Sequence, residues 1–330
     1  MAGVQDCALT VTVSNAGGLG SLPCAMLNTD ALDKALTTLQ EQTSKPYNLN
    51  FFCHSPPQPQ PEREAAWRKF LAPFYEEYAL DVDAITDGPE RRPFSHETAD
   101  IVEAFKPAVV SFHFGLPNKT LLARVKSWGS KIIASATTLE EALFLEAAGV
   151  DAIIAQGLEA GGHRGHFLSN DLSKQERIMT LLPQIIKAVK LPVIAAGGIV
   201  DVQSITPAIA LGAAGVQTGT AYLLCPESTT SALHRAAFQS NAACHTTLTN
   251  VFSGRAARGI INRAIRELGP INPSAPTFPL ASTAMAPLRT AAEKEDLNDF
   301  SPLWCGENAS ACKNISAAEL TRSLASAFSL

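Results

Sequence analysis

Residues 193–220 read VIAAGGIVDVQSITPAIALGAAGVQTGT, and this stretch decides the fold class. It opens with an apolar run, Val193–Ala196, that ends in two glycines, and it closes with a second run, Gly215–Thr218, that ends in Gly219-Thr220. Between the two runs, apolar residues recur at three- and four-residue spacing over Val202–Leu211, which is typical of a helix. A short strand, a helix and another short strand form a β-α-β unit. The stretch therefore predicts an α/β protein with a parallel sheet.

The same alternation repeats outward from this stretch through most of the chain. A length of 330 residues leaves room for one barrel of roughly 250 residues and a smaller appendage. We therefore expect a TIM (β/α)8 barrel, of which seven strands are visible in the sequence. These strands are Gly20–Leu22, Leu49–Cys53, Val109–Phe114, Ile132–Ala136, Ala152–Gln156, Val193–Ala196 and Gly215–Thr218, and the helices between the later ones are Lys119–Trp128, Leu139–Ala148, Gln175–Val189 and Val202–Leu211.

Two segments interrupt the alternation and suggest a division into domains. The segment Ser55–Pro61 reads SPPQPQP, whose prolines exclude a helix or a central strand, and it opens an excursion over about 55–105. After Tyr222 the alternation stops, and residues 226–300 have the pattern of helices with proline-rich joints. We expect a barrel over 1–225, a smaller, mostly helical cap over 226–300, and a C-terminal segment, 301–330, whose helix Ala317–Phe328 packs back on the barrel.

Composition and charge restrict the class of partner. Hydrophobic residues make up 46% and charged residues 17% of the chain, and the net charge of -5 is spread without acidic or basic blocks. Such a surface lacks the positive field that nucleic acid or anionic lipid requires, so we expect a small-molecule partner and a monomer or homodimer. Seven cysteines form an odd set without a C-x-x-C pair, which argues against a disulfide framework and a zinc site. The N-terminus has no export signal and no apolar run reaches about 20 residues, so we expect a cytoplasmic protein.

Two glycine-bearing turns point to a phosphate site. Gly197-Gly198 and Gly219-Thr220 follow the last two expected strands, where barrels commonly bind phosphate through backbone N–H groups and a helix N-terminus. A single Gly-Gly pair would be read as an ordinary turn. Two such turns on consecutive strands favour the phosphate of a mononucleotide, with Gln217 and Thr218 beside it.

Two histidines are the candidate catalytic residues. Gly161-Gly162-His163 follows the fifth expected strand, and the glycines would let the backbone pass close to a flat ligand with an imidazole beside it. His113 closes a different strand at the same rim. An imidazole there can act as a base or as a cationic partner for a substrate anion, and the sequence leaves both roles open. His166 lies three residues beyond His163 without carboxylate or cysteine ligands at useful spacing, so we expect no metal site.

For each of the other polar residues of this region, the sequence allows two interpretations. Asn50 interrupts an apolar strand and needs a partner, which is either a flavin or substrate carbonyl or the neighbouring backbone. Gln156 and Gln217 raise the same question on their strands. Glu159 and Arg164 are read as an ion pair or as solvated loop charges rather than catalytic groups.

The chain resembles a known family, the class I nitronate monooxygenases, once called 2-nitropropane dioxygenases. The resemblance covers essentially the whole chain. The Glu-Ala-Gly-Gly-His element also occurs, in variants, in enoyl-ACP and quinone reductases built on the same flavin barrel, whereas His-Phe-Gly-x-Pro and Ser-Ala-Thr-Thr favour the nitronate branch. The segments that carry the resemblance to the nitronate monooxygenases are Val13–Ser21, Asn50–Phe52, Ser111–Gly115, Ser135–Thr138, Gln156–Gly165, Pro192–Gly198, Gln217–Thr220, Gly254–Gly259 and Leu303-Trp304.

The resemblance implies a cofactor, a reaction and a set of site residues. It implies that FMN is held by residues at the strand ends, with His163 and His113 facing the substrate. It also implies oxidation of an alkyl nitronate, such as propionate 3-nitronate, by O2 to a carbonyl product with release of nitrite or nitrate, without NAD(P)H. The cofactor-binding residues expected on this basis are Met1, Ala2, Gly3, Asn50, Gln156, Gly161, Gly162, Gly197, Gly198, Gln217, Thr218, Gly219 and Thr220.

One departure from the family concerns the start of the chain. Family members begin with a strand ending in Ala-Pro-Met-Ala-Gly, whose last residues contact the flavin, whereas this chain begins at Met1-Ala2-Gly3. We expect the first barrel strand to be absent, through a start codon assigned too late or a natural truncation, and we expect two unpaired sheet edges and poor FMN retention.

Two alternative functions stay open at this point. One is an NAD(P)H-dependent flavin reductase of the enoyl-ACP or quinone reductase type. The other is a non-catalytic, flavin-binding degenerate barrel.

Overall fold

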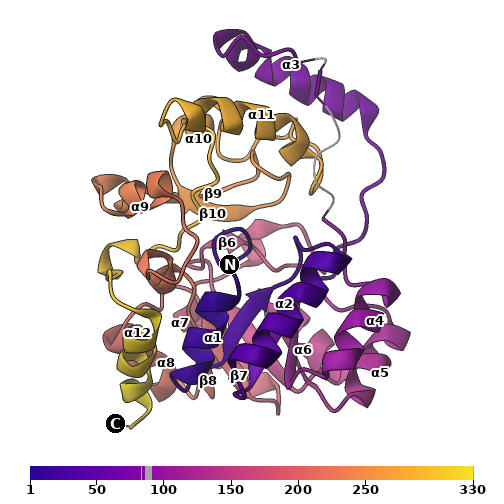
Figure 1. The fold of residues 1–330 in the computed structure, drawn as a ribbon, viewed down its shortest axis with the longest axis vertical. Coiled ribbons are helices and arrows are strands. Elements are labelled where there is room, and N and C mark those ends of the chain that lie inside the picture. Colours follow the sequence, from indigo (N-terminus) through magenta and orange to yellow (C-terminus); the bar gives the residue numbers. More distant parts are fainter. Residues whose placement is uncertain (83, 86–90, 330) are drawn as a thin grey trace.

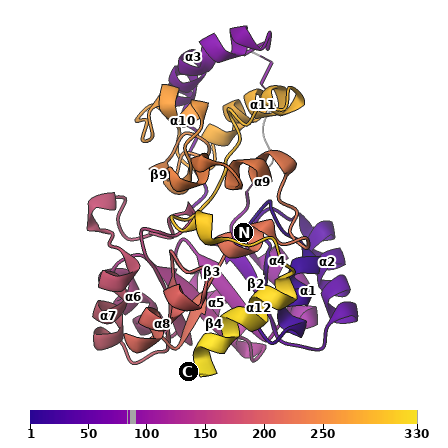
Figure 2. The ribbon, with the colours of Figure 1, turned by 90° about the vertical axis from the view of Figure 1, so that its left-hand side faces the viewer.

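The chain is described from a computed structural model that covers residues 1–82, 84–85 and 91–329. It has two parts stacked along the long axis: a curled sheet surrounded by helices, and a smaller cap (Figure 1). The N-terminus lies between the two parts, and the C-terminus lies at the end of the sheet remote from the cap (Figure 2).

Seven parallel strands form the large sheet, and they follow one another in chain order. Among the described residues, β1 pairs only with β2 and β8 only with β7, so the curled sheet has two edges. All seven expected strands are present. The predicted TIM-barrel fold class is therefore confirmed, with seven strands in the sheet. The strands are β1 (Gly20–Pro23), β2 (Tyr47–Phe52), β3 (Val109–His113), β4 (Lys131–Ala136), β5 (Ala152–Gln156), β7 (Val193–Ala196) and β8 (Gly215–Gln217).

Helices cover the outer face of this sheet, and their first turns have polar caps. The Asn118 and Thr138 side chains accept from the N–H groups of Leu121 and Glu141, and Asp201 forms a capping box with Ser204. All four crossover helices predicted between the later strands are confirmed. The helices are α1 (Cys7–Asn15), α2 (Thr29–Gln42), α4 (His96–Phe105), α5 (Lys119–Ser127), α6 (Leu139–Ala148), α7 (Ile178–Ala188), α8 (Val202–Ala210) and α12 (Ala317–Ala325).

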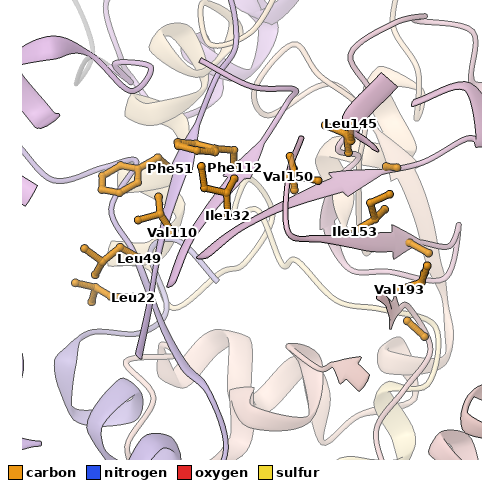
Figure 3. Packing of buried hydrophobic residues seen from close by; sticks show 14 of the residues in the cluster. Leu22, Leu49, Phe51, Val110, Phe112, Ile132, Leu145, Val150, Ile153 and Val193 are labelled. Carbon is orange, nitrogen blue, oxygen red and sulfur yellow. The ribbon is translucent and has the colours of Figure 1, made fainter. Parts of the chain in front are cut away.

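The two faces of the sheet differ in polarity because successive side chains of a strand point to opposite faces. Figure 3 shows the apolar side chains that pack beneath the helices, among them Leu22, Leu49, Val110, Ile132, Ile153 and Val193. The residues that alternate with them on the inner face include Asn48, Asn50, Ser111, Ser135 and Gln156. The inner face therefore carries a row of polar groups that continues to the carboxyl ends of the strands.

The cap contains a small antiparallel sheet as well as helices. Its strands lie in the order β6-β10-β9, and β6 (Gly162–His163) belongs to the loop that follows β5 of the barrel. Composition alone did not reveal these strands. The other elements of this part are β9 (Thr246–Thr249), β10 (Ala257–Ile260), α9 (Ala232–Phe238), α10 (Arg263–Leu268) and α11 (Ala281–Lys294). The 3-10 helices among the described residues are η1 (Leu172–Lys174), η2 (Thr220–Leu224), η3 (Asn241–Cys244), η4 (Ala309–Ala311) and η5 (Ser326–Ser329).

The excursion after β2 also contributes to the cap. Helix α3 (Pro61–Glu77) lies beside α11 at the top of the molecule (Figure 1), and the Tyr75 hydroxyl donates to the Ala284 carbonyl at 2.6 Å. Trp67 and Leu71 of α3 share a buried cluster with residues of α10 and α11. The C-terminal helix α12 instead packs against α1 and α8 of the barrel. No helix in the described part of the chain is long and apolar enough to cross a bilayer.

The burial of α3 predicts that the cap loses stability when this contact is weakened. Leu71 is fully buried in the cap cluster, whereas Lys69 on the same helix is exposed. Leu71→Ala should lower the free energy of unfolding by about 2–5 kcal/mol, because it removes a buried side chain and leaves a cavity. Lys69→Ala is the matched control and should change it by less than about 0.5 kcal/mol. Urea denaturation followed by circular dichroism measures both, and equal effects would contradict the proposed packing of α3.

Candidate functional site

His163 lies at the junction of barrel and cap. It belongs to β6, which pairs with β10 of the cap so that His163 stands opposite Ala257. Its Nε2 atom is 2.8 Å from the Ser253 hydroxyl oxygen. Aromatic rings from both parts enclose the imidazole, with centroids 5.3–6.5 Å away; they belong to Phe52, Phe114, Phe278 and Trp304. The ring is thus held in an apolar surround with one polar partner.

The main-chain carbonyl of His163 joins the second candidate histidine to the first. It accepts from Gln156 Nε2 at 3.0 Å and from His113 Nε2 at 3.2 Å. Because a carbonyl can only accept, His113 carries its proton on Nε2, and Nδ1 accepts from the Ser135 hydroxyl at 3.1 Å. The structure therefore brings His163, His113 and Gln156 together, as residues of one site.

The loop after β6 is fitted closely to His113. A Cβ atom at Gly165 would lie 2.7 Å from the Cε1 atom of His113, so only glycine fits there without displacement. The Gly165 N–H donates to Gln156 Oε1 at 2.7 Å, so the Gln156 amide uses both its ends to hold this loop. For Gln156 the partner is therefore the backbone of its own loop.

The structure corrects the reading of Arg164 as a solvated or ion-paired loop charge. Arg164 is fully buried, and its guanidinium donates to the carbonyls of Gly157 and Gln156 and to the Gln175 side chain at 2.7–2.8 Å. Burial lowers its pKa to about 9. Glu159 does form an ion pair, with Arg177 at 3.3 Å, and it also accepts from the first N–H of α7 at 2.9 Å. Both residues shape the loop that carries His163.

The histidines of the site are neutral at pH 7, and the positive charge lies on arginines. Burial, together with the charges of Arg91 and Arg255, lowers the pKa of His163 well below its usual value. Burial and then Arg255 lower the pKa of His113 to about 3. An imidazolium at His163 is therefore disfavoured.

Arg255 is a residue of the site that sequence reasoning did not single out. Its guanidinium lies over the Phe114 ring, 4.1 Å from the centroid, and donates to the carbonyls of Arg164 and His166. Phe114 itself has a positive φ of 69°, an unusual backbone conformation for a bulky side chain. Arg255 and Ser253 stand next to β10, about 90 residues from His163 in sequence. Only the Gly254–Gly259 motif hinted at this segment.

The glycine turns at the strand ends meet under one segment of chain, 305–308. The Asn308 amide donates to the Gly198 carbonyl at 2.6 Å, and the Gly306 N–H donates to the Thr220 hydroxyl at 3.0 Å. A Cβ atom at Gly161 would lie 2.5 Å from the Gly306 nitrogen. The structure thus brings the turns after β5, β7 and β8 to one place. Residue 161 must be a glycine because a side chain there would clash with the main chain of segment 305–308.

These turns present unused donors. Gly197 and Gly198 have φ values of 119° and 68°, a conformation that glycine adopts readily. The N–H groups of Gly198, Gly219 and Thr220 donate to no acceptor within the described residues. Backbone N–H groups without a protein partner on two neighbouring turns are suited to a phosphate.

The remaining expected cofactor-binding residues lie at different positions around this rim; they are Asn50, Gln217, Thr218 and Met1–Gly3. Asn50 is half-buried and donates to the Ser111 hydroxyl of the next strand at 2.7 Å. This partner is a side chain, whereas the sequence suggested a flavin or substrate carbonyl or the neighbouring backbone. Gln217 is exposed at the end of β8, with Thr218 half-buried beside it. Met1 lies at the same rim, because a Cβ atom placed at Gly219 would be 3.4 Å from the Cγ atom of Met1. Ala2 and Gly3 are the next residues in the chain.

Comparisons with known proteins agree with this arrangement. Residues 1–327 match the family model described as nitronate monooxygenase. The chain is 40% identical to a nitronate monooxygenase of Paraburkholderia phytofirmans, covering 98% of this chain and 89% of that protein. It is 39% identical to one of Pseudomonas aeruginosa, covering 98% and 93%.

Two solved structures resemble the whole chain. The crystal structure of nitroalkane oxidase from Streptomyces ansochromogenes has a TM-score of 0.90 at 35% identity and covers 100% of this chain and 94% of that one. FabK from Thermotoga maritima has a TM-score of 0.72 at 25% identity and covers 100% and 90%.

The buried neutral histidines predict that the protein loses stability in mild acid. His166 is buried, and burial with Arg255 lowers its pKa to about 3, below the value of about 6.5 in an unfolded chain. Between these pH values the unfolded chain binds a proton that the folded chain does not, so the free energy of unfolding falls as pH falls below about 6.5. His166→Asn should reduce this slope by up to about 1.4 kcal/mol per pH unit. Urea denaturation at pH 6.5, 5.5 and 4.5 tests it, and parallel slopes would refute it.

Proposed function

The chain belongs to the nitronate monooxygenase family, and from that premise we propose that it oxidises alkyl nitronates with O2, using FMN as its cofactor and propionate 3-nitronate as a substrate. The products are a carbonyl compound and nitrite or nitrate. The observation that carries the proposal is the neutral His163 imidazole set among buried guanidiniums at the same rim as the three glycine turns.

The residues at the strand ends fit a flavin mononucleotide. The free N–H groups of Gly198, Gly219 and Thr220 would bind its phosphate, and Gly162, around whose Cβ position no heavy atom lies within 4 Å, leaves space beside His163 for a flat ring. Asn50, Gln156, Gly161, Gly197, Gln217 and Thr218 complete the cofactor site we propose, with Met1, Ala2 and Gly3 at its edge. When bound, FMN supplies the acceptor for the substrate's electrons and the means of reaction with O2.

The charges of the site suit an anionic substrate. A nitronate carries a negative charge that is costly to bury without a partner. The Arg255 and Arg91 guanidiniums are close enough to His163 to lower its pKa, so their field also acts on an anion bound beside that ring. The walls formed by Phe52, Phe114 and Phe278 exclude water and strengthen this attraction.

His163 is placed to take a proton from a neutral nitroalkane. The Ser253 hydroxyl donates to the Arg255 carbonyl at 3.4 Å, so its oxygen accepts from Nε2–H of His163. This arrangement leaves the lone pair on Nδ1. A neutral imidazole can accept the α-proton of a nitroalkane, and a nitronate, already deprotonated, does not need that step.

Anaerobic absorbance spectra of the protein reconstituted with excess FMN test the function. We expect propionate 3-nitronate to bleach the flavin spectrum and readmission of O2 to restore it with release of nitrite. Bleaching by NADPH or NADH but not by the nitronate would support the flavin reductase instead. Flavin binding without bleaching by any of the three would support a non-catalytic barrel.

The proposed base predicts a separation of two activities in one variant. His163→Asn should lower turnover of neutral 1-nitropropane by about 100-fold or more, since general base catalysis contributes about 10²–10⁴, and lower turnover of its nitronate by less than about 10-fold. Nitrite release measures both. His96→Asn, at an exposed position on α4, is the control and should leave both unchanged. Equal losses on the two substrates would show that His163 is not the base.

A further inference from the structure

Arg91 lies close to the same Phe278 ring that packs against His163. The Phe278 centroid is 5.5 Å from the Arg91 guanidinium carbon and 5.3 Å from the His163 centroid. The Arg91 carbonyl accepts from His54 Nε2 at 3.0 Å, and the His54 ring packs edge-on against Phe278 at 4.9 Å. Arg91 and His163 are therefore two polar groups on one aromatic wall.

The Arg91 guanidinium is half-buried and has no carboxylate partner among the described residues. The charged group that most affects it is another cation, Arg289, and burial together with that charge lowers its pKa. Arg258 and Arg263, by contrast, each contact carboxylates, and Arg164 and Arg255 donate to carbonyls. A partly buried cation without a counter-ion is costly, and it is stabilised when an anionic ligand binds.

The surroundings define what the ligand must look like. His54 donates its Nε2–H to the Arg91 carbonyl, so its Nδ1 atom is an acceptor, and the Arg91 guanidinium is the group at this position that can bind an anion. Between Arg91 and His163 the wall is made of Phe52, Phe114 and Phe278, which suit methylene carbons rather than further polar groups. A ligand that satisfies the site has an anion at each end and a short apolar chain between them.

We propose that Arg91 forms a second anion subsite that binds the carboxylate at the far end of a nitronate whose reacting end faces His163. The inference rests on the proposed function and names the residue that recognises the carboxylate of propionate 3-nitronate. Arg91 is then a specificity residue, because it binds the part of the substrate that does not react, and Phe278 packs against both Arg91 and His163.

The test compares two nitronates of equal chain length. Propionate 3-nitronate carries a carboxylate where propyl-1-nitronate carries a methyl group. Arg91→Met should lower kcat/KM for propionate 3-nitronate by about 10- to 100-fold, mainly through KM, because one charged hydrogen-bonding partner is lost. It should change kcat/KM for propyl-1-nitronate by less than about 3-fold, and Arg91→Lys should retain part of the preference.

The matched control is the neighbouring arginine. Arg92 pairs with Glu97 at 3.8 Å and its side chain is 70% exposed, so Arg92→Met should leave the ratio of the two kcat/KM values unchanged. An equal loss on both nitronates in Arg91→Met would overturn the inference. So would an unaltered enzyme that turns over both nitronates without preference, a result that does not depend on how the variants fold. Turnover of neither nitronate would overturn the proposed function, and this inference with it.

Discussion

The pairing of β6 with β10 is the constraint on which the site depends. Two residues of the loop after β5 leave the barrel and become an edge of the cap sheet, with His163 opposite Ala257 and Gly162 opposite Arg258. The carbonyl of His163 is in turn held by Gln156 and His113 of the barrel. Main-chain bonds to both parts therefore fix the position of the imidazole, whose Nε2 atom contacts Ser253.

The division of charge between arginine and histidine follows from burial. An imidazole in this apolar surround loses its proton readily, as the lowered pKa values of His163 and His113 show. A guanidinium keeps its charge even when its pKa falls to about 10, as at Arg255. The site can thus hold positive charge beside a neutral imidazole, which two histidines alone could not provide at neutral pH.

Sequence reasoning found the parts of this protein that local patterns encode. Strand ends identify His113, His163 and the glycine turns because parallel strands bring their carboxyl ends to one rim. The partners Ser253, Arg255 and Phe278 and the cation Arg91 were missed because each reaches the site through the cap, across contacts distant in sequence. Strand β9 reads TTLT, too short to be separated from a loop, and Arg164 lies in a polar stretch that gives no sign of its burial.

The cap also determines the geometry of the glycine turns, through the same strand that holds His163. One edge of β10 pairs with β6 at Ala257 and Arg258, and further along it Gly259 bridges to Trp304 while Ile260 donates to the Leu303 carbonyl. The segment that follows Trp304 bonds to the turns at Gly198 and Thr220. A shift of β10 would therefore move the imidazole and the cover of the glycine turns together. Because both are attached to one strand, the imidazole and the glycine turns keep their spacing even though the barrel sheet itself has two edges.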